Sequence, residues 1–354
     1  MSDTERSASG FIAFFRRIPL TTLIIGAFFI LVLVGGGLIG LSVTGLISES
    51  LQRFGMWGLF VLAMVPSIQS GTGPNFALPV GIVGGLLAIV IAMEVGFTGA
   101  ALLVAAAAMA IVIGAAFGFI YGILMNAVKG SEMAIATYTG FSLTYLFCLI
   151  WLTLPFSHPN IGMFIGSGIR NMIALEPFGA QKLLENLWQF KIFGISISTG
   201  TWLVIIAACT LMWLFFRTKT GMSISAVGMN PTFAAAVGLN VNRSRVIANM
   251  ISTALGAVGV IIYAQGYGFV QLYDFPLWMG FAAVAAILVG GATAQRAKII
   301  HVFIGTFLFQ GLITSGPAVF SRLLQGEDIS DAVRMVIQNG IILYALTQKK
   351  VDGE

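Results

Sequence analysis

Charged residues are scarce in this chain. Of its 354 residues only 9% are Asp, Glu, Lys or Arg, whereas soluble globular domains carry roughly 25%. Hydrophobic residues make up 58%, and the mean hydropathy is +0.98. The basic residues lie singly or in pairs, and not in the cluster that a nucleic-acid interface needs. We therefore expect a single integral membrane domain over residues 1–354, in contact with membrane lipid and not with nucleic acid.

Residues that carry catalytic or metal chemistry are also scarce. Cys148 and Cys209 each lie within an apolar run, and His158 and His301 are too far apart for an HExxH zinc motif. The chain lacks a G-x-x-x-x-G-K-[ST] phosphate-binding loop and contains no Gly-Lys dipeptide. We expect no catalytic site, no metal site and no cofactor in this chain.

Ionisable residues are almost absent from the middles of the apolar stretches. Charge within a membrane is costly and usually marks an ion pathway. Its scarcity argues against a carrier driven by protons or sodium. Uphill transport by this chain would therefore need energy from another subunit.

Long apolar stretches, by contrast, recur along the whole chain. A bilayer core about 30 Å thick needs about 20 mostly apolar residues per helical span. The pattern predicts an all-α polytopic membrane protein with about ten transmembrane helices, at residues 20–45, 53–68, 76–93, 97–128, 133–155, 199–216, 246–264, 277–295, 299–318 and 332–347. The longest segment expected outside the membrane covers about residues 156–198.

The distribution of Lys and Arg predicts the orientation of these spans. With a cytoplasmic N-terminus, twelve of the 18 basic residues fall inside and six outside, as the positive-inside rule requires. Both termini, with Arg6, Arg16, Arg17, Lys349 and Lys350, are then cytoplasmic. Spans two to five and seven to ten form two sets of four with opposite orientation, which is the arrangement of an inverted repeat.

The external segment contains one stretch with helical periodicity, residues 181–190 (QKLLENLWQF). Apolar residues would form one face of this helix and polar residues the other: Leu183, Leu184, Leu187 and Trp188 against Lys182, Glu185 and Asn186. Two interpretations remain open, an anchor at the membrane interface or a surface that receives an external partner.

Prolines and glycines interrupt the apolar pattern between residues 65 and 81 (VPSIQSGTGPNFALPVG) and must break the helix there. Irregular backbone at membrane depth is tolerated only where protein or a water-filled cavity satisfies it. The polar residues of this stretch are therefore candidates for a solute pathway, with a tight turn between two spans as the alternative: Gln69, Ser70, Thr72 and Asn75.

Neutral polar residues inside other spans are further candidates for the pathway, with hydrogen bonding between helices as the alternative: Tyr138, Thr139, Gln310 and Thr314. A pathway without charge argues for an uncharged solute that is rich in hydroxyl groups or heterocyclic.

Residues 217–245 (RTKTGMSISAVGMNPTFAAAVGLNVNRSR) are the long polar interruption of the second half. Basic residues at both ends predict a cytoplasmic loop, and the alanines between Gly228 and Gly238 favour a helix. We expect a short helix within about residues 222–240, lying flat beneath the membrane domain as a docking element.

This segment resembles the cytoplasmic coupling motif of ABC importer permeases in the branched-chain amino acid, simple sugar and nucleoside group. The pattern Ala-x-Gly-x-Asn-x-x-Ala-Ala-x-x-x-Gly-(Ile/Leu)-x-Val, followed by a basic pair, falls on Ala226, Gly228, Asn230, Ala234 or Ala235, Gly238, Leu239, Val241, Arg243 and Arg245. A Gly-Gly loop and a Gly-Thr span downstream are also similar, at Gly290, Gly291, Gly305 and Thr306. The first half departs from both better-known subgroup patterns, because it lacks the Asp-Leu-Ser motif of many sugar permeases and the Asn-Ile-Gly-x-Glu-Gly motif of many nucleoside permeases.

The resemblance implies a fold like that of type II ABC importers, in the bacterial cytoplasmic (inner) membrane. It implies two cytoplasmic ATPase subunits that bind ATP and Mg, a second permease subunit, identical or related, and an external solute-binding protein. Asn230 and Pro231 would start the coupling helix, Ala234 and Ala235 would seat in a groove of the ATPase, and the basic pair would anchor the exit. The expected solute is a simple sugar, with a nucleoside or a branched-chain amino acid as alternatives. The alternative to an importer subunit is an ion-coupled carrier.

Overall fold

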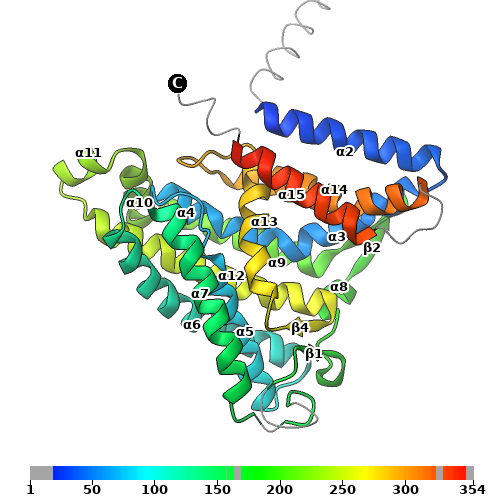
Figure 1. Ribbon diagram of the computed structural model, residues 1–354, viewed down its shortest axis with the longest axis horizontal. Helices are drawn as coiled ribbons and strands as arrows, with labels where there is room; N and C mark the ends of the chain where they lie inside the picture. Colours follow the sequence, from blue (N-terminus) through cyan, green and yellow to red (C-terminus); the bar gives the residue numbers. More distant parts are fainter. Residues whose placement is uncertain (1–18, 157, 163–168, 324–329, 348–354) are drawn as a thin grey trace, which may run out of the picture.

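Helices dominate the computed structural model of the chain, which describes residues 19–156, 158–162, 169–323 and 330–347 (Figure 1). The termini with their predicted cytoplasmic charges lie outside the described residues. The helices are α2 (Leu20–Leu38), α3 (Val43–Leu62), α4 (Met64–Gln69), α5 (Leu78–Glu94), α6 (Gly99–Ala127), α7 (Glu132–Thr153), α8 (Leu183–Asn186), α9 (Thr199–Phe216), α10 (Lys219–Met229), α11 (Pro231–Ala236), α12 (Val241–Tyr267), α13 (Phe275–Val289), α14 (Ile299–Leu323) and α15 (Ser330–Thr347).

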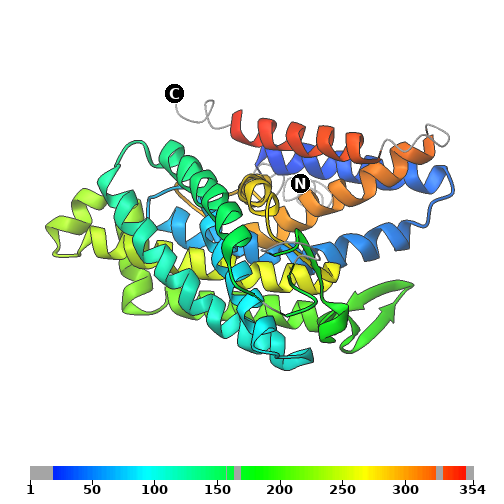
Figure 2. The ribbon, with the colours of Figure 1, turned by 60° about the horizontal axis from the view of Figure 1, so that its bottom comes forward.

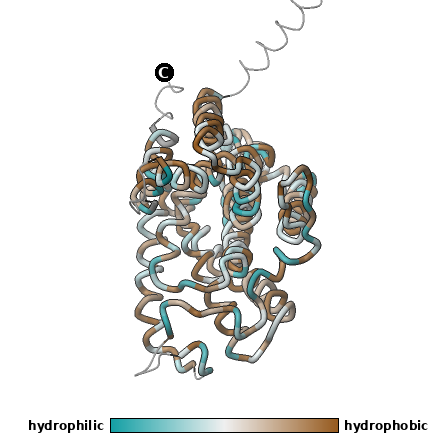
Figure 3. Tube along the Cα trace, turned by 90° about the vertical axis from the view of Figure 1, so that its right-hand side faces the viewer, coloured by the Kyte–Doolittle hydropathy of each residue, from teal (hydrophilic) through white to brown (hydrophobic). Residues whose placement is uncertain are grey.

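In the part of the chain that the structure describes, seven helical stretches are long and apolar enough to cross a membrane, with α3 and α4 counted together. The apolar helices α5 and α13 are shorter, at 17 and 15 residues. Hydrophobic residues predominate along most of the helical trace (Figure 3). The chain is therefore a mostly helical, multi-pass membrane protein.

The first predicted break lies in the wrong place. The chain leaves α2 after Leu38 and begins α3 at Val43, where the Ser42 hydroxyl accepts a hydrogen bond from the Gly45 amide. The polar residues around Glu49 and Arg53, interpreted as a loop, belong to the first turns of α3. Helix is compatible with them because Arg53 pairs with Glu49 at 3.7 Å and lies over the Tyr267 ring.

Small residues allow α12 to occupy the centre of the helix packing. Gly114, Gly118 and Gly122 follow one another at a spacing of four along α6. A Cβ atom at these three positions would lie 2.8, 2.7 and 2.9 Å from atoms of α12. Close approach of this kind is how small residues hold helices together where lipid removes the hydrophobic drive for association.

Loops that the predicted orientation places on the same side of the membrane lie together in the structure. At one end, here called the α11 end, residues 70–77, 128–131, 217–240 and 290–298 lie together, and Gln69 Nε2 donates to the Ala297 carbonyl at 2.7 Å. At the other, the hairpin end, β1 (Met172–Ala174) pairs with β4 (Phe269–Gln271). Both ribbon views place α11 and the β2–β3 hairpin at opposite ends (Figures 1 and 2).

The predicted helix over residues 181–190 is wrong for most of its length. Only Leu183–Asn186 is helical, and β2 (Gln189–Ile192) then forms an antiparallel hairpin with β3 (Ile195–Ser198). The predicted faces hold only in part: Lys182 and Asn186 are exposed and Leu183 and Leu184 are partly buried, but Glu185 is only 2% exposed while Trp188 is 74% exposed. The described chain is thus helical with two small sheets, where the sequence predicted helices alone.

Candidate functional site

The segment predicted to dock forms two helices, α10 and α11, joined at Asn230. The Asn230 side chain accepts from the Phe233 amide at 2.9 Å, and Pro231 occupies the first turn, where its missing N–H costs nothing. Asn240 caps α12 in the same way, accepting from the Arg243 amide at 2.9 Å. The prediction that Asn230 and Pro231 start a helix is confirmed, but this helix has only six residues.

Gly228 lets α10 lie directly on the backbone that follows α4. A Cβ atom at Gly228 would lie 2.0 Å from the Gln69 carbonyl oxygen, so only glycine fits at this crossing. Next to it, the Ser225 hydroxyl donates to Gln69 Oε1 at 2.8 Å. The α10 helix and the residue 70–77 segment are therefore held as one unit.

The outer surface of this unit is partly apolar. Met229, Phe233 and Val237 are exposed, and Ala235 is exposed beside them. Ala234 is fully buried within the chain, so only one member of the predicted alanine pair reaches the surface. A groove of about 390 Å³ borders Ala235, lined also by Lys129, Pro231, Thr232, Leu239, Asn240, Val241 and Asn242.

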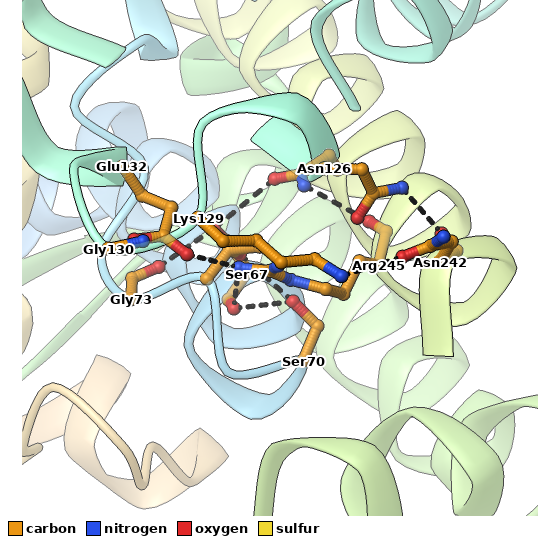
Figure 4. Close-up of polar contacts among 11 residues, drawn as sticks. Ser67, Ser70, Gly73, Asn126, Lys129, Gly130, Glu132, Asn242 and Arg245 are labelled. Carbon is orange, nitrogen blue, oxygen red and sulfur yellow. Dashed lines mark hydrogen bonds and ion pairs between the residues drawn. The ribbon is translucent and has the colours of Figure 1, made fainter. Parts of the chain in front are cut away.

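An ion pair connects the start of α12 to the start of α7. Arg245 is 6% exposed, and its guanidinium donates to Glu132 Oε1 at 2.5 Å (Figure 4). The other Glu132 oxygen accepts from the Gly130 amide at 2.8 Å, and Lys129 Nζ donates to Asn242 Oδ1 at 3.1 Å. Arg243, two residues earlier, is exposed. The two predicted anchors therefore differ, because Arg245 is buried in the chain and only Arg243 is free to meet a partner.

The break in the helix predicted between residues 65 and 81 is confirmed for residues 70–77, whereas Pro66 lies within α4 and Pro79 in the first turn of α5. Most of the polar groups in the break are satisfied internally. The Ser67 and Thr72 hydroxyls lie 3.0 Å apart, and the Ser70 hydroxyl donates to the Ser67 carbonyl at 2.8 Å. Asn75 Nδ2 donates to the Ser252 hydroxyl of α12 at 2.8 Å, while Asn75 Oδ1 is buried without a partner. The segment packs between α10 and α12, and is more than a surface turn.

A cavity of about 720 Å³ opens beside this segment. It is bordered by Thr72 and Phe76, by Glu132 and Thr137 of α7, and by Phe281 of α13, together with Gly71, Gly73, Pro74, Gly130, Ser131, Met133, Ala134, Ala294 and Gln295. A second cavity of about 410 Å³ is lined by Ser70, Glu132, Arg245 and residues of α10. Hydroxyl, amide and aromatic groups thus face the same space, with the carboxylate of Glu132 already paired.

The structure brings together only part of the predicted pathway. Thr72 and Ser70 border the two cavities, and Gln69 holds α10 instead. Gln69 and Asn75 line neither cavity, and the same holds for the four candidates in other spans: Tyr138 is exposed on α7, Thr139 donates to the Ile135 carbonyl of its own helix, Gln310 is buried with its Nε2 unpaired, and Thr314 is partly exposed on α14.

Sequence reasoning missed Glu132 as a partner of Arg245. The residues are separated by 113 positions, so no local spacing indicates the pair. The available signal was that one charge of each sign lies at a span end predicted on the same side. The pair also depends on the long-range packing of α6 on α12, which the sequence does not show.

The described chain is thus a multi-pass helical domain with a short capped helix, α11, at one end. The family described as branched-chain amino acid transport system, permease component, matches residues 20–346 of this chain. The chain belongs to this family and is an ABC importer permease of the branched-chain amino acid, sugar and nucleoside group.

Relatives with described roles include three kinds of permease. The chain is 26% identical over 239 residues to the nucleoside ABC transporter permease NupB of Lactococcus lactis subsp. cremoris, covering 66% of this chain and 60% of that one. It is 27% identical to the galactofuranose transporter permease YtfT of Escherichia coli, covering 53% and 61%. It is 26% identical to the autoinducer 2 import permease LsrC of Photorhabdus laumondii, covering 73% and 70%.

The match therefore spans about 60% of the first relative's length. Among solved structures, the chain is similar to an inward-facing putative metal-chelate type ABC transporter, with a TM-score of 0.43, 14% identity and 84% of each chain covered. These relatives are permease components and not catalytic subunits.

Proposed function

We propose that this chain is the transmembrane subunit of a binding-protein-dependent ABC importer that moves a small uncharged solute, a simple sugar, into the cell. Two partner ATPase subunits bind ATP and Mg and supply the energy. An external solute-binding protein delivers the solute, and a second permease subunit, identical or related, completes the pathway. A nucleoside is the main alternative solute, and a branched-chain amino acid is another; both stay within the same mechanism.

The observation that carries this proposal is the mechanical continuity at the α11 end. The exposed surface of α11 passes through Asn230 into α10, and α10 rests on the Gln69 carbonyl through Gly228. The segment that follows Gln69 borders the 720 Å³ cavity. Because packed elements transmit displacement with little loss, a force on α11 would move the wall of that cavity.

The arrangement of the loops supports the expected topology. Ten crossings, in which α3 and α4 count as one, would place the α11 end in the cytoplasm together with both termini. The membrane would then be the bacterial cytoplasmic membrane, and two sets of four spans would form an inverted repeat around the pathway. The grouping of alternate loops at opposite ends agrees with this topology.

The chemistry of the cavity supports an uncharged, ring-shaped solute. Thr72, Thr137 and Gln295 offer groups that bind hydroxyls, and Phe281 offers an aromatic surface. Glu132, the carboxylate in this wall, is neutralised by Arg245. A sugar and the ribose of a nucleoside share this hydroxyl-rich ring, which is why the two solutes compete.

Ala235→Glu tests the proposal in the assembled transporter. Ala235 is exposed on α11, so the variant should insert and fold, while a bulky charge in the docking surface should abolish solute-stimulated ATP hydrolysis. Gln189→Glu, which adds the same charge on the exposed hairpin at the opposite end, is the matched control and should retain stimulation. Unchanged stimulation in Ala235→Glu would contradict the assignment.

Transport by the chain alone separates an importer subunit from a carrier. The purified permease, reconstituted in vesicles with a radiolabelled sugar, should be inactive until its ATPase and binding protein are added with ATP. Uptake by the permease alone under an ion gradient would favour the ion-coupled carrier instead.

A further inference from the structure

The β2–β3 hairpin has one apolar side and one polar side. In an antiparallel pair, residues opposite each other lie on the same side of the sheet. The register pairs Phe190 with Ile197 and Ile192 with Ile195 on one side. The other side carries Lys191 opposite Ser196, and Gln189 opposite Ser198.

Strand β3 connects the hairpin to the rest of the protein. The Ser196 amide donates to the Ser48 hydroxyl of α3 at 3.0 Å, and the Ser198 hydroxyl donates to the Glu185 carbonyl at 3.2 Å. Gln189, Ser196, Ile197 and Ser198 line a cavity of about 290 Å³ together with Glu185 and residues of α3. Ile195 and Ile197 of β3 are partly buried, whereas every residue of β2 is exposed. The hairpin is therefore held to α3 through β3, and β2 and the turn remain exposed.

The tip and β2 of the hairpin are exposed. Phe193 is 94% exposed, Trp188 is 74% exposed, and Phe190 and Ile192 are also exposed. These side chains extend the row of apolar groups to the end of the hairpin. Exposed patches of this kind mark a site of contact with a partner or a membrane.

Phe193 has an unfavourable conformation for its type. Phe193 and Gly194 form the two-residue turn, with φ of 50° and 80°. Turns with positive φ at both positions favour Asn, Asp or Gly at the first one, because a bulky side chain there is strained. A phenylalanine at this place costs stability unless its ring gains a favourable environment elsewhere.

The position of the hairpin indicates what that environment is. The chain leaves β3 directly into α9 at Thr199, and α9 exposes Leu203 and Ile206 along a candidate membrane span. At its other extremity, Gly194 lies next to Thr44, in the first turn of α3. The hairpin thus lies at the level where two spans begin, continuous with the apolar surface of α9.

Aromatic residues are enriched at this level of a membrane protein. Trp and Phe place their rings at the boundary between headgroups and acyl chains, while Lys extends its ammonium toward the headgroups. The hairpin has this division, with Phe190 and Ile192 on one side and Lys191 on the other, and with the exposed rings of Trp188 and Phe193 directly before and after β2.

We infer that the β2–β3 hairpin is a membrane-interface anchor, whose exposed apolar residues on β2 and the turn insert into the phospholipid leaflet on the hairpin side. Its partner is the boundary of headgroups and acyl chains. The anchor holds the external segment at a fixed height beside α3 and α9. This role is separate from the transport proposal and stands or falls independently of it.

Site-specific fluorescence tests the anchor in the full chain reconstituted in phosphatidylcholine vesicles. A Cys148→Ser, Cys209→Ser background receives a single cysteine, as Phe193→Cys at the tip or Lys191→Cys on the polar side, labelled with an environment-sensitive dye. The dye at 193 should be quenched by lipids with brominated acyl chains and protected from aqueous iodide. The dye at 191 should show the opposite pattern, which makes it the matched control.

A second measurement avoids substitution of the turn. Brominated lipid should quench part of the Trp fluorescence of the parent protein. This quenched part should be smaller in Trp188→Phe, because that variant lacks a Trp at the interface. Phe193→Cys and Trp188→Phe should each have the same melting temperature as the protein in which the substitution was made.

Iodide access at 193 with no quenching by brominated lipid, together with an unchanged quenched fraction in Trp188→Phe, would overturn the proposal. Protection at 193 that appears only after addition of a solute-binding protein, or only at high permease density, would assign the surface to that protein or to a second permease and would equally overturn it.

Discussion

The two ends of this molecule both expose apolar side chains, but they do so on different supports. At the α11 end, Phe233 lies on a short capped helix and Val237 directly after it, and Lys129, Lys219 and Arg243 of this end are also exposed. At the hairpin end, Phe190 lies on β2 and Phe193 in the turn of a two-stranded sheet that leads directly into α9.

The difference shows that exposure alone does not identify a partner. Apolar groups surrounded by charge, and tied to the interior through Gln69 and Gly228, suit a protein that must push on the permease. Apolar aromatic groups at the level where spans begin suit lipid. The contacts between each exposed surface and the interior therefore indicate its partner. The following variants change those contacts.

Arg245→Met should have the largest effect at the α11 end. The substitution leaves Glu132 as a partly buried charge without its partner, which typically costs about 3–5 kcal/mol. We expect a marked fall in the melting temperature of the purified permease and loss of transport. Arg243→Met, on the exposed neighbour, should change stability by about 0.5 kcal/mol or less.

The double variant Glu132→Gln, Arg245→Met gives the check on this explanation. It removes both charges and should recover part of the lost stability. If the loss of stability in the double variant equals the sum of the losses in the two single variants, the ion pair does not couple α7 to α12.

Gly228→Val should have the second largest effect. The added side chain collides with the Gln69 carbonyl, and overpacking of this kind costs about 1–3 kcal/mol. Solute-stimulated ATP hydrolysis should be lost along with the close approach of α10. Gly340→Val is the matched control, because nothing lies within 4 Å of a Cβ atom at Gly340. Equal behaviour of the two variants would show that the crossing at Gly228 is not needed.

Asn230→Ala should act locally at the junction of α10 and α11. Loss of the cap costs about 1 kcal/mol, and α11 has only six residues over which to recover it. Hydrogen exchange should speed up at residues 231–236, while the global melting temperature changes little. Asn230→Asp keeps the acceptor and should preserve protection, so equal exchange in the two variants would argue against the cap.

A pH effect at the hairpin end should be the smallest. Burial raises the pKa of Glu185 above its usual value, with the Gln52 hydrogen bond and the charges of Lys182 and Arg53 opposing it. A raised carboxyl pKa means that the folded chain holds the proton more tightly than the unfolded chain. Stability is then greatest below the unfolded pKa, and declines as the pH rises from there through the folded pKa.

Glu185→Gln should remove this dependence, since glutamine keeps the shape without the charge. Melting temperatures across the acidic range should decline with rising pH in the parent and stay flatter in the variant. Parallel curves would show that Glu185 is not the titrating group.

Much of this architecture could be predicted from the sequence. The apolar runs predicted the helices, and the prolines and glycines between residues 65 and 81 predicted the break after Gln69. Asn230 followed by Pro231 predicted the start of α11, because capping depends on a few adjacent residues. Those features depend on local chemistry, which a sequence shows directly.

The remaining features depend on contacts between distant segments. The Glu132–Arg245 pair and the crossing at Gly228 require the packing of α10 and α12 to be known. The hairpin was missed because the Leu and Trp residues of positions 183–188 fit a helical stripe, while the turn at Phe193 and Gly194 lacks the usual Asn or Asp. Glu185 was placed on a solvated face, although the hydrogen bond from Gln52 allows it to be buried.

The most direct measurement is cross-linking in the assembled transporter. Two variants, Ala235→Cys and Phe193→Cys, each carry a single cysteine in a background without Cys148 and Cys209. A cross-linker of short reach should join position 235 to the ATPase subunit and should not join position 193 to it. A cross-link to the ATPase from 193, or none from 235 in a complex that hydrolyses ATP, would contradict the account.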